Sequence, residues 1–107
     1  MIAAVIYYEV KISAENQEQA STIMNSLLAK KLITGGQFVK ASARFLWKGK
    51  VHDMAYVTMT SFTLEAHKIA IIDDVRRTSL EEVPMIWFVA IDDVNSELGE
   101  WIDRTLV

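Results

Sequence analysis

Cysteine is absent from the 107-residue sequence. Its absence excludes disulfide bonds, zinc sites built from thiolates and cysteine nucleophiles together. A chain without disulfides is compatible with a reducing compartment, and its first residues lack the basic segment that begins a secretory signal. We therefore expect a cytoplasmic protein.

Proline occurs once and glycine four times, and no low-complexity segment or linker interrupts the chain. Because 107 residues are too few for two independent cores, we expect a single domain over residues 1–107. A hydrophobic share of 51% excludes an intrinsically disordered chain. The longest apolar run, Pro84 to Ile91, is far shorter than the ~20 residues that cross a bilayer, so no membrane partner is expected.

Basic charge and enzyme motifs are also scarce. The 11 Lys and Arg residues face 14 Asp and Glu residues, and this net charge of −3 argues against a nucleic-acid partner, which needs a basic surface. The chain contains no G-x-S-x-G elbow, Walker loop or dinucleotide-binding glycine motif. We therefore expect a protein that is not an enzyme.

Strand-like alternation is present in several segments. It predicts strands over residues 3–12 and 37–62, and the continuous apolar segment Met85–Ile91 predicts a further strand, central and covered on both faces. With the intervening helices, the order is β-α-β-β-α-β plus a terminal helix. This order predicts the α+β class and a ferredoxin-like fold, with an antiparallel sheet, a long central β-hairpin and an extra C-terminal helix.

Helical spacing of apolar residues separates these strands. The first helix is predicted to begin at Ser13, as its N-cap, and to be stopped by Gly35–Gly36. Thr63 is expected to cap a second helix that continues to about Thr78, and Asn95 to cap a short last one.

Residues 37–62 predict one long hairpin with Lys48–Gly49 as a two-residue turn, because glycine accepts the positive φ that such turns require. This turn sets a register that places opposite charges together and apolar side chains together. The predicted pairs are Trp47 with Lys50, Arg44 with Asp53, Phe45 with His52 and Ala43 with Met54. A shift of the register by one residue would lose both the charge pairing and the apolar pairing.

The predicted hairpin is too long for its own domain. An arm of roughly 11 to 12 residues reaches nearly 40 Å, whereas a chain of this size has a radius of gyration of about 13 Å. The overhanging tip carries Phe45, Leu46, Trp47 and Val51, which would form an exposed apolar patch. We therefore expect further copies of the chain to cover the tip in a homo-oligomer. The alternative is a hairpin that bends or bulges back onto its own sheet.

Four motifs in order resemble the CutA family of divalent-cation tolerance proteins. They are Leu28-Ala29-Lys30-Lys31-Leu32, Phe45-Leu46-Trp47-Lys48-Gly49-Lys50, Glu82-Val83-Pro84 and Trp101-Ile102. Their order and spacing match the family pattern over essentially the whole chain. The resemblance implies a homotrimer of ferredoxin-like subunits that exchange long β-hairpins, with a role in divalent metal-ion tolerance.

Some positions depart from the family pattern. The family's A-C-V-N stretch falls on residues 34–37 and its His-Pro-Tyr on residues 79–81, so its cysteine and histidine are absent here. Thr63 retains the threonine at the end of the third strand. Because the missing groups are those most often proposed as copper ligands, the resemblance implies weakened metal ligation.

His52 and Glu82 are the remaining candidates for metal ligands, with copper as the possible ion. Asp53 cannot join His52, because adjacent strand residues point to opposite faces, and a divalent site usually needs three or four protein donors. Copper binding through His52 and Met54 would require a second subunit, and the alternative for His52 is packing in an interface. Asp73–Asp74 is expected to be solvated or to cap a helix.

A further group of residues is expected at the subunit interface or in the cleft between subunits. These are Arg44, Phe45, Trp47, Lys50, Met54 and Thr63. An anionic ligand could bind the basic members, or Arg44 could be occupied by Asp53 while the lysines are solvated.

Three functions remain open at this level. The first is a non-enzymatic CutA-like trimer in metal-ion tolerance. The second is a small-ligand sensor resembling the trimeric nitrogen-regulatory PII-type proteins, which carry a longer loop between the middle strands. The third is a dimeric ferredoxin-like enzyme. The mass of the assembly separates the third from the other two.

Overall fold

The computed structural model describes residues 6–106, so residues 3–5 of the first predicted strand lie outside the described part. In chain order the elements are β1 (Tyr7–Ala14), α1 (Gln17–Ala29), β2 (Gly36–Trp47), β3 (Lys50–Leu64), a single 3-10 turn η1 (Glu65–His67), α2 (Lys68–Thr78), β4 (Met85–Ala90) and α3 (Ser96–Thr105). This order confirms the predicted succession of strands and helices.

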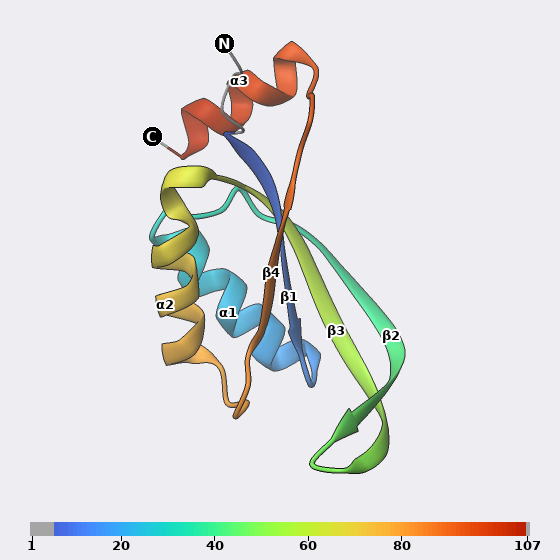
Figure 1. Ribbon diagram of the computed structural model, residues 1–107. Helices are drawn as coiled ribbons and strands as arrows, with labels where there is room; N and C mark the ends of the chain where they lie inside the picture. Colours follow the sequence, from blue (N-terminus) through green and yellow to red (C-terminus); the bar gives the residue numbers. More distant parts are fainter. Residues whose placement is uncertain (1–5, 107) are drawn as a thin grey trace.

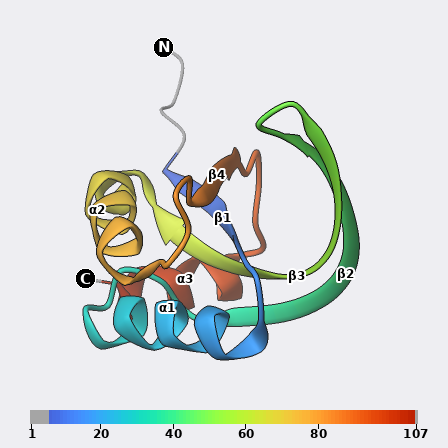
Figure 2. The same cartoon turned by 90° about the horizontal axis from the view of Figure 1, so that it is seen from below.

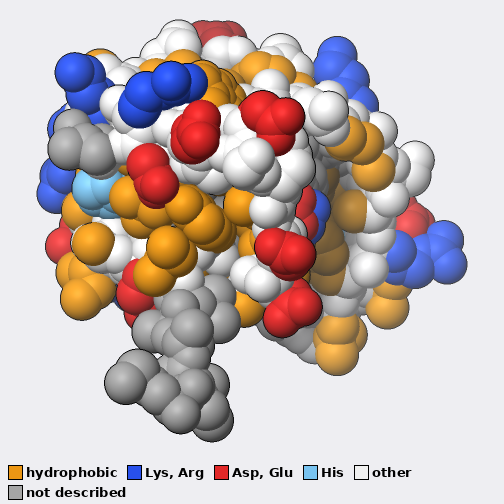
Figure 3. Space-filling view, turned by 90° about the horizontal axis from the view of Figure 1, so that it is seen from above, with side chains coloured by type: hydrophobic (Ala, Val, Ile, Leu, Met, Phe, Trp, Pro, Cys, Tyr) orange, Lys and Arg blue, Asp and Glu red, His pale blue; other side chains and the backbone are white. Residues whose placement is uncertain are grey.

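The strands form one antiparallel sheet in the order β2-β3-β1-β4. Helices α1 and α2 lie on the same side of the sheet, and α3 lies at the end opposite the hairpin tip (Figures 1 and 2). The predicted α+β class with a ferredoxin-like arrangement is therefore confirmed. On the face that carries α3, acidic and basic side chains are scattered among hydrophobic ones (Figure 3).

The hydrophobic core fills the space between the sheet and the two long helices. Its residues alternate along the strands and recur at helical spacing in α1 and α2, which is the patterning that a sheet with one covered face requires. They include Val10, Ile12 and Ala14 of β1, Val57 and Met59 of β3, Ala20, Ile23, Met24 and Leu27 of α1, and Ile71 and Val75 of α2.

Two predicted helix caps are wrong. The N-cap of α1 is Asn16, whose side chain accepts a backbone hydrogen bond from the first turn. Ser13 is instead a buried residue of β1 whose hydroxyl lies 2.7 Å from that of Thr58. Thr63 is a buried residue of β3 that donates to the carbonyl of Leu32 at 2.8 Å. A hydroxyl can satisfy its hydrogen bonds inside a sheet as well as at a cap, so the local pattern did not distinguish the two.

The end of α1 also differs from the prediction. The helix ends at Ala29, and Lys31 adopts the left-handed conformation at a φ of 54°. The backbone N–H of Leu32 then bonds the carbonyl of Leu27 at 3.0 Å, which closes the helix in the manner usually provided by glycine. Gly35–Gly36 does not end the helix and instead leads into β2.

The prediction that residues 85–91 form a central strand is wrong. Strand β4 lies at the edge of the sheet and pairs within the described chain with β1 alone. Trp87 and Val89 are exposed on the side away from the helices. The unbroken apolar sequence gives the strand two apolar faces, and none of residues 6–106 covers the second face.

The predicted hairpin register is confirmed. Pairing runs without a bulge from Gly36 opposite Ser61 to Trp47 opposite Lys50. Lys48 and Gly49 have φ values of 48° and 78°, and positive values at both central positions are what a type I′ turn requires.

The hairpin extends beyond the body of the domain and curls away from α1 and α2 (Figure 2). The domain measures 47 × 30 × 22 Å, so one axis is much longer than the others. Curvature brings the tip toward the α2–β4 segment, which is the bending that the sequence left open as an alternative. Even so, Leu46 is 73% exposed and Val51 is 66% exposed.

Asp74 is a buried carboxylate on α2 that bonds side chains and not a helix end, so the prediction that it is solvated or caps a helix is wrong. It accepts hydrogen bonds from Ser26 at 2.7 Å and Arg77 at 3.1 Å, and it forms an ion pair with Lys30. Burial raises the pKa of Asp74, but the hydrogen bonds from Lys30, Ser26 and Arg77 outweigh burial and hold this pKa below its ordinary value. Asp74 thus joins α1 to α2.

Among residues 6–106, no helix combines the length and the apolar character that crossing a bilayer requires.

Candidate functional site

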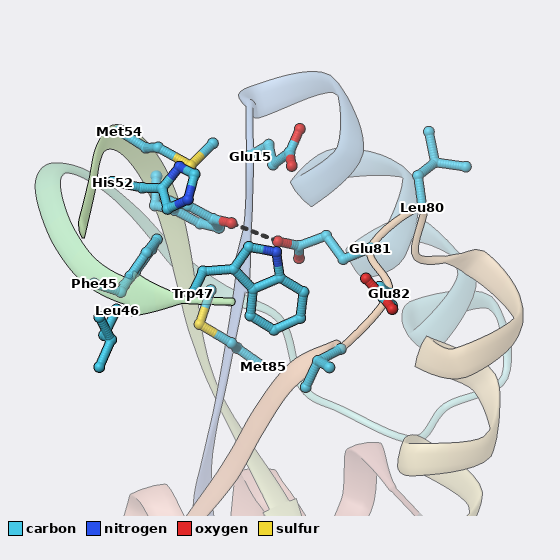
Figure 4. A pocket seen from close by; sticks show the side chains of 12 residues that line it. Glu15, Phe45, Leu46, Trp47, His52, Met54, Leu80, Glu81, Glu82 and Met85 are labelled. Atoms are coloured by element: carbon cyan, nitrogen blue, oxygen red, sulfur yellow. Dashed lines mark hydrogen bonds between the residues drawn. The ribbon is translucent and has the colours of Figure 1, made fainter. Parts of the chain in front are cut away.

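A cavity of about 470 Å³ lies between the hairpin tip and the segment that joins α2 to β4. The end of β1 and the start of α1 border the same region, since all these parts lie at one end of the sheet (Figure 1). The side chains that line the cavity converge from three separate stretches of the chain: Glu15, residues 45–56 and residues 80–85 (Figure 4).

Glu81 lines this cavity and links two of the segments that surround it. The hydroxyl of Tyr56 donates to Glu81 Oε1 at 2.7 Å, which ties the loop after α2 to β3 (Figure 4). The backbone N–H of Glu81 donates to Ser79 Oγ at 3.1 Å, so a short local turn orients the glutamate. The second oxygen, Oε2, is buried and has no hydrogen-bond partner among the described residues.

The surroundings of Glu81 favour its neutral form. Burial raises the pKa of the Glu81 carboxyl, the hydrogen bond from Tyr56 opposes this effect, and the nearby negative charge of Glu15 adds to it. Burial and the hydrogen bond to Glu81 together raise the pKa of the Tyr56 hydroxyl well above its ordinary value. Tyr56 is therefore a neutral hydrogen-bond donor at physiological pH.

Aromatic side chains form the wall on the hairpin side. The rings of Phe45 and Tyr56 meet edge to face, with centroids 5.2 Å apart. Trp47 lines the same wall and is 39% exposed, and Lys48 Nζ lies 5.5 Å from the centroid of its ring. His52, directly opposite Phe45 in the hairpin, also lines the cavity.

The predicted interface and cleft residues do not all gather here. Phe45, Trp47 and Met54 line the cavity, whereas Arg44 forms an exposed ion pair with Asp53 at 2.6 Å. Lys50 is exposed at the turn and is not part of the lining. Thr63 is fully buried further along β3 and holds the chain after α1. The predicted pairing of Arg44 with Asp53 is confirmed, which leaves Arg44 already occupied.

His52 and Glu82 both line the cavity, but they do not form a metal centre within one chain. Glu82 Oε2 forms an ion pair with Lys48 Nζ at 3.1 Å, so its charge is already matched. Residues 6–106 contain no group of three or more His, Asp or Glu side chains close enough to hold a metal ion. Since a divalent site usually takes three or four protein donors, the side chains of residues 6–106 in a single chain do not fit such an ion.

Comparison with known proteins identifies the family. The family model described as CutA1 divalent ion tolerance protein matches residues 8–105. The chain belongs to the CutA1 family. A divalent-cation tolerance protein CutA of Thermococcus kodakarensis is 27% identical over 89 residues, which cover 83% of this chain and 86% of that relative.

Solved CutA structures share the fold. The structure of a periplasmic divalent cation tolerance protein CutA from Archaeoglobus fulgidus has a TM-score of 0.91 at 26% identity, and the match covers 94% of this chain and 99% of that one. CutA1 from Oryza sativa has a TM-score of 0.90 at 22% identity, with 96% of this chain and 95% of that one covered. The CutA resemblance inferred from the sequence is confirmed.

Residues 34–37 and residues 79–81, where the sequence is expected to depart from the CutA pattern, lie far apart in this chain. Thr34 Oγ1 accepts a hydrogen bond from the backbone N–H of Phe62, whereas Glu81 bonds Tyr56. Phe62 and Tyr56 are separated along β3 by about 20 Å at the usual rise of a strand. In the described part of one chain, the two stretches therefore do not meet in a single site.

Sequence reasoning missed the contact between Tyr56 and Glu81. A partial signal exists, because His52, Met54 and Tyr56 alternate along one face of β3 and all three line the cavity. No periodic pattern in the sequence predicts the path of residues 79–84, which brings Glu81 to that face.

Proposed function

We propose that this CutA1 protein is a single CutA-like domain that assembles as a homotrimer through its long hairpin. Exposed apolar side chains at the tip support this proposal, since Leu46 and Val51 are largely exposed and Trp47 is partly exposed in the described part of the chain. Both edge strands, β2 and β4, also carry backbone groups that no other described strand pairs. Further copies of the chain can cover the apolar tip and also pair the free backbone groups of the edge strands.

Trp47→Ala tests this assembly. Removing a large aromatic anchor from an interface is expected to weaken association by about 2–4 kcal/mol per interface. Light scattering across a dilution series should show three chains of 12.1 kDa for the unmodified protein and earlier dissociation for the variant.

Two matched variants control for nonspecific effects. Trp47→Phe keeps an aromatic ring and should retain most of the assembly, and Ile69→Ala removes an exposed apolar side chain from α2, outside the hairpin. A single chain at every concentration of the unmodified protein would overturn the trimer, and unchanged association of Trp47→Ala would place Trp47 outside the interface.

We propose a non-enzymatic role in divalent-cation tolerance or response, in the cytoplasm, with weakened metal ligation. Family membership over residues 8–105 is the observation that carries the role. The missing cysteine and the lack of a three-donor group among residues 6–106 support weakened ligation. His52 and Glu82 stay as the proposed metal-facing residues, with copper as the ion to test. The two-residue turn does not favour a PII-type sensor with its longer loop.

Isothermal titration with Cu(II) and with Zn(II) tests the ligation. We expect no saturable heat at micromolar metal, because too few donors converge among the described residues of one chain. Saturable binding that is lost in His52→Ala and in Glu82→Gln would contradict weakened ligation and establish both residues as ligands. For the role itself, cells that lack the gene should grow less well in elevated copper or zinc, and equal growth would contradict it.

A further inference from the structure

Two arginines precede a pair of hydroxyl residues at the end of α2. The sequence there is Arg76-Arg77-Thr78-Ser79-Leu80. Thr78 and Ser79 are the only Ser, Thr or Tyr residues of the chain with two basic residues among the three before them. A guanidinium group is always charged and pairs with a carboxylate through two N–H donors, so an acidic protein surface can recognise it specifically. Kinases select substrates by such charge patterns, and this one favours a serine or threonine kinase that reads basic residues.

The structure distinguishes Ser79 from Thr78 as the acceptor. Thr78 is the last residue of α2, and its hydroxyl donates to the backbone carbonyl of Asp74 at 3.0 Å. Ser79 lies just outside the helix in an extended backbone conformation, with a φ of −74° and a ψ of 142°. A kinase aligns the substrate hydroxyl with its catalytic aspartate, so a side chain that is not bonded to a helix is the better acceptor.

The residues that a kinase would contact around Ser79 are accessible. Arg76 and Arg77 are exposed and lie in the last turn of α2, where helix ends open most readily. Leu80 is 80% exposed, and Ser79 itself is half-buried. Recognition therefore requires the opening of one helical turn and no disruption of the core.

Ion pairing within the domain does not account for both arginines. Arg77 forms an ion pair with Asp74 at 3.1 Å. Arg76 takes part in no ion pair among residues 6–106. Neither arginine belongs to the hairpin tip, residues 45–51, that the proposed assembly covers. Arg76 is thus a charged and exposed side chain with a position suited to recognition.

A phosphate on Ser79 would act on the contact between Glu81 and Tyr56. The Ser79 hydroxyl accepts the backbone N–H of Glu81 at 3.1 Å, and this turn orients the glutamate toward Tyr56 (Figure 4). Phosphorylation converts that hydroxyl to an ester and adds a charge of about −1.5 to −2 beside Glu81. Glu81 tolerates further negative charge poorly, because its Oε2 is buried with no partner among the described residues and Glu15 already acts on the same carboxyl.

We propose that Ser79 is a phosphorylation site for a kinase that reads Arg76 and Arg77, and that its phosphate releases residues 79–84 from β3. In the reaction, Ser79 Oγ attacks the γ-phosphorus of ATP, and the bond from that phosphorus to the bridging oxygen of the β-phosphate breaks. The hydroxyl proton passes to the catalytic aspartate of the kinase, and ADP leaves. The inference rests neither on the trimer nor on the role in metal tolerance.

The first experiment treats the native protein with ATP, Mg²⁺ and the catalytic subunit of cyclic-AMP-dependent protein kinase, which reads basic residues. The intact mass should show about one added phosphoryl group per chain, and fragmentation should place it on Ser79. Ser79→Ala should abolish the modification, whereas Thr78→Ala should retain it. An unmodified native protein, or a phosphate at another residue, would overturn the site.

The second experiment tests recognition of the arginines. Arg76→Gln should slow phosphorylation about tenfold or more, because the charged pair with the kinase is lost. Arg104→Gln removes an exposed arginine from the last turn of α3 and should leave the rate unchanged. Equal rates for the two variants would overturn the role of Arg76.

Protein isolated from its own cells decides whether the site is used. A fraction of the chains should carry phosphate on Ser79, detected by fragmentation of the peptide that contains residues 78–84. Absence of this phosphate in both growing and stationary cells would overturn a physiological role for the site.

Hydrogen–deuterium exchange measures the effect of the phosphate. Peptides that cover residues 79–84 should exchange at least about tenfold faster in the phosphorylated protein, and peptides of α1 should not change. Unchanged or slower exchange of residues 79–84 would overturn the release from β3. Circular dichroism checks the folding of Ser79→Ala, and fragmentation of the phosphorylated parent locates the phosphate if that variant does not fold.

Discussion

Gly36→Ala is expected to lower the free energy of unfolding by about 3 kcal/mol or more, at the upper end of overpacking substitutions. A Cβ atom at position 36 would lie 1.8 Å from the carbonyl oxygen of Thr60, 2.9 Å from its carbonyl carbon and 3.1 Å from the Cα of Ser61. These are backbone atoms of β3, so they cannot rotate away as the end of a side chain could. The substitution must separate β2 from β3 where their pairing begins.

Urea unfolding followed by tryptophan fluorescence measures this effect, with protein concentration held constant so that assembly contributes equally. Gly99→Ala is the matched control. Its Cβ would contact side-chain atoms of Val94 and Tyr7 at 3.3 and 3.4 Å, which have room to adjust, and it lies inside α3, where alanine is favoured. We expect the control to remain within about 1 kcal/mol of the parent. If Gly36→Ala and the parent unfold at the same urea concentration, β3 must be able to move away from position 36 at little cost.

Asp74→Asn is expected to destabilise the fold by about 2–3 kcal/mol at neutral pH, because it removes the charge that receives three hydrogen bonds. The value lies below that for a fully buried ion pair, since the side chains of Lys30 and Arg77 are 49% and 63% exposed and can be solvated when the carboxylate is lost. Thermal unfolding measures the difference. Asp73→Asn, on the exposed neighbour, is the control and should have little effect.

The loss in Asp74→Asn should depend on pH. The folded state holds the pKa of Asp74 below its ordinary value of 3.8, so the unfolded chain binds this proton more readily. The stabilisation by Asp74 is therefore complete above the ordinary value and is lost as the pH falls through the lowered value. The difference in unfolding free energy between parent and variant should narrow below about pH 4. A constant difference down to pH 2 would contradict a charge-based role.

Turn geometry and side-chain periodicity explain which parts of this architecture were predictable from the sequence. The register of twelve residue pairs follows from one two-residue turn, because a hairpin turn fixes all pairings that come after it. The apolar faces of α1 and of the strands follow from periods of 3.6 and 2, since side-chain direction repeats with the backbone. The exposed apolar tip follows from the length of the strands together with the apolar residues that the sequence places at the turn. Among the site residues, Phe45, His52 and Met54 were placed together by that register.

The wrong predictions share a physical origin. Ser13 and Thr63 have hydroxyls that suit either a helix cap or a strand, and the choice depends on partners that are distant in sequence, Thr58 and Leu32. An apolar segment such as residues 85–90 is compatible with a central or an edge strand, because periodicity does not report how many neighbours a strand has.

By itself, the sequence determined the order of the elements, the hairpin register, the excess of exposed apolar surface and the membership of the CutA1 family. Tertiary structure alone decided that Asp74 joins two helices, that Gly36 passes against the backbone of β3, and that Glu81 meets Tyr56 in an apolar cavity. The physical reason is the separation along the sequence over which each effect acts. Turn geometry and side-chain periodicity act between near neighbours, whereas burial and charge pairing depend on which distant segments the folded chain brings together.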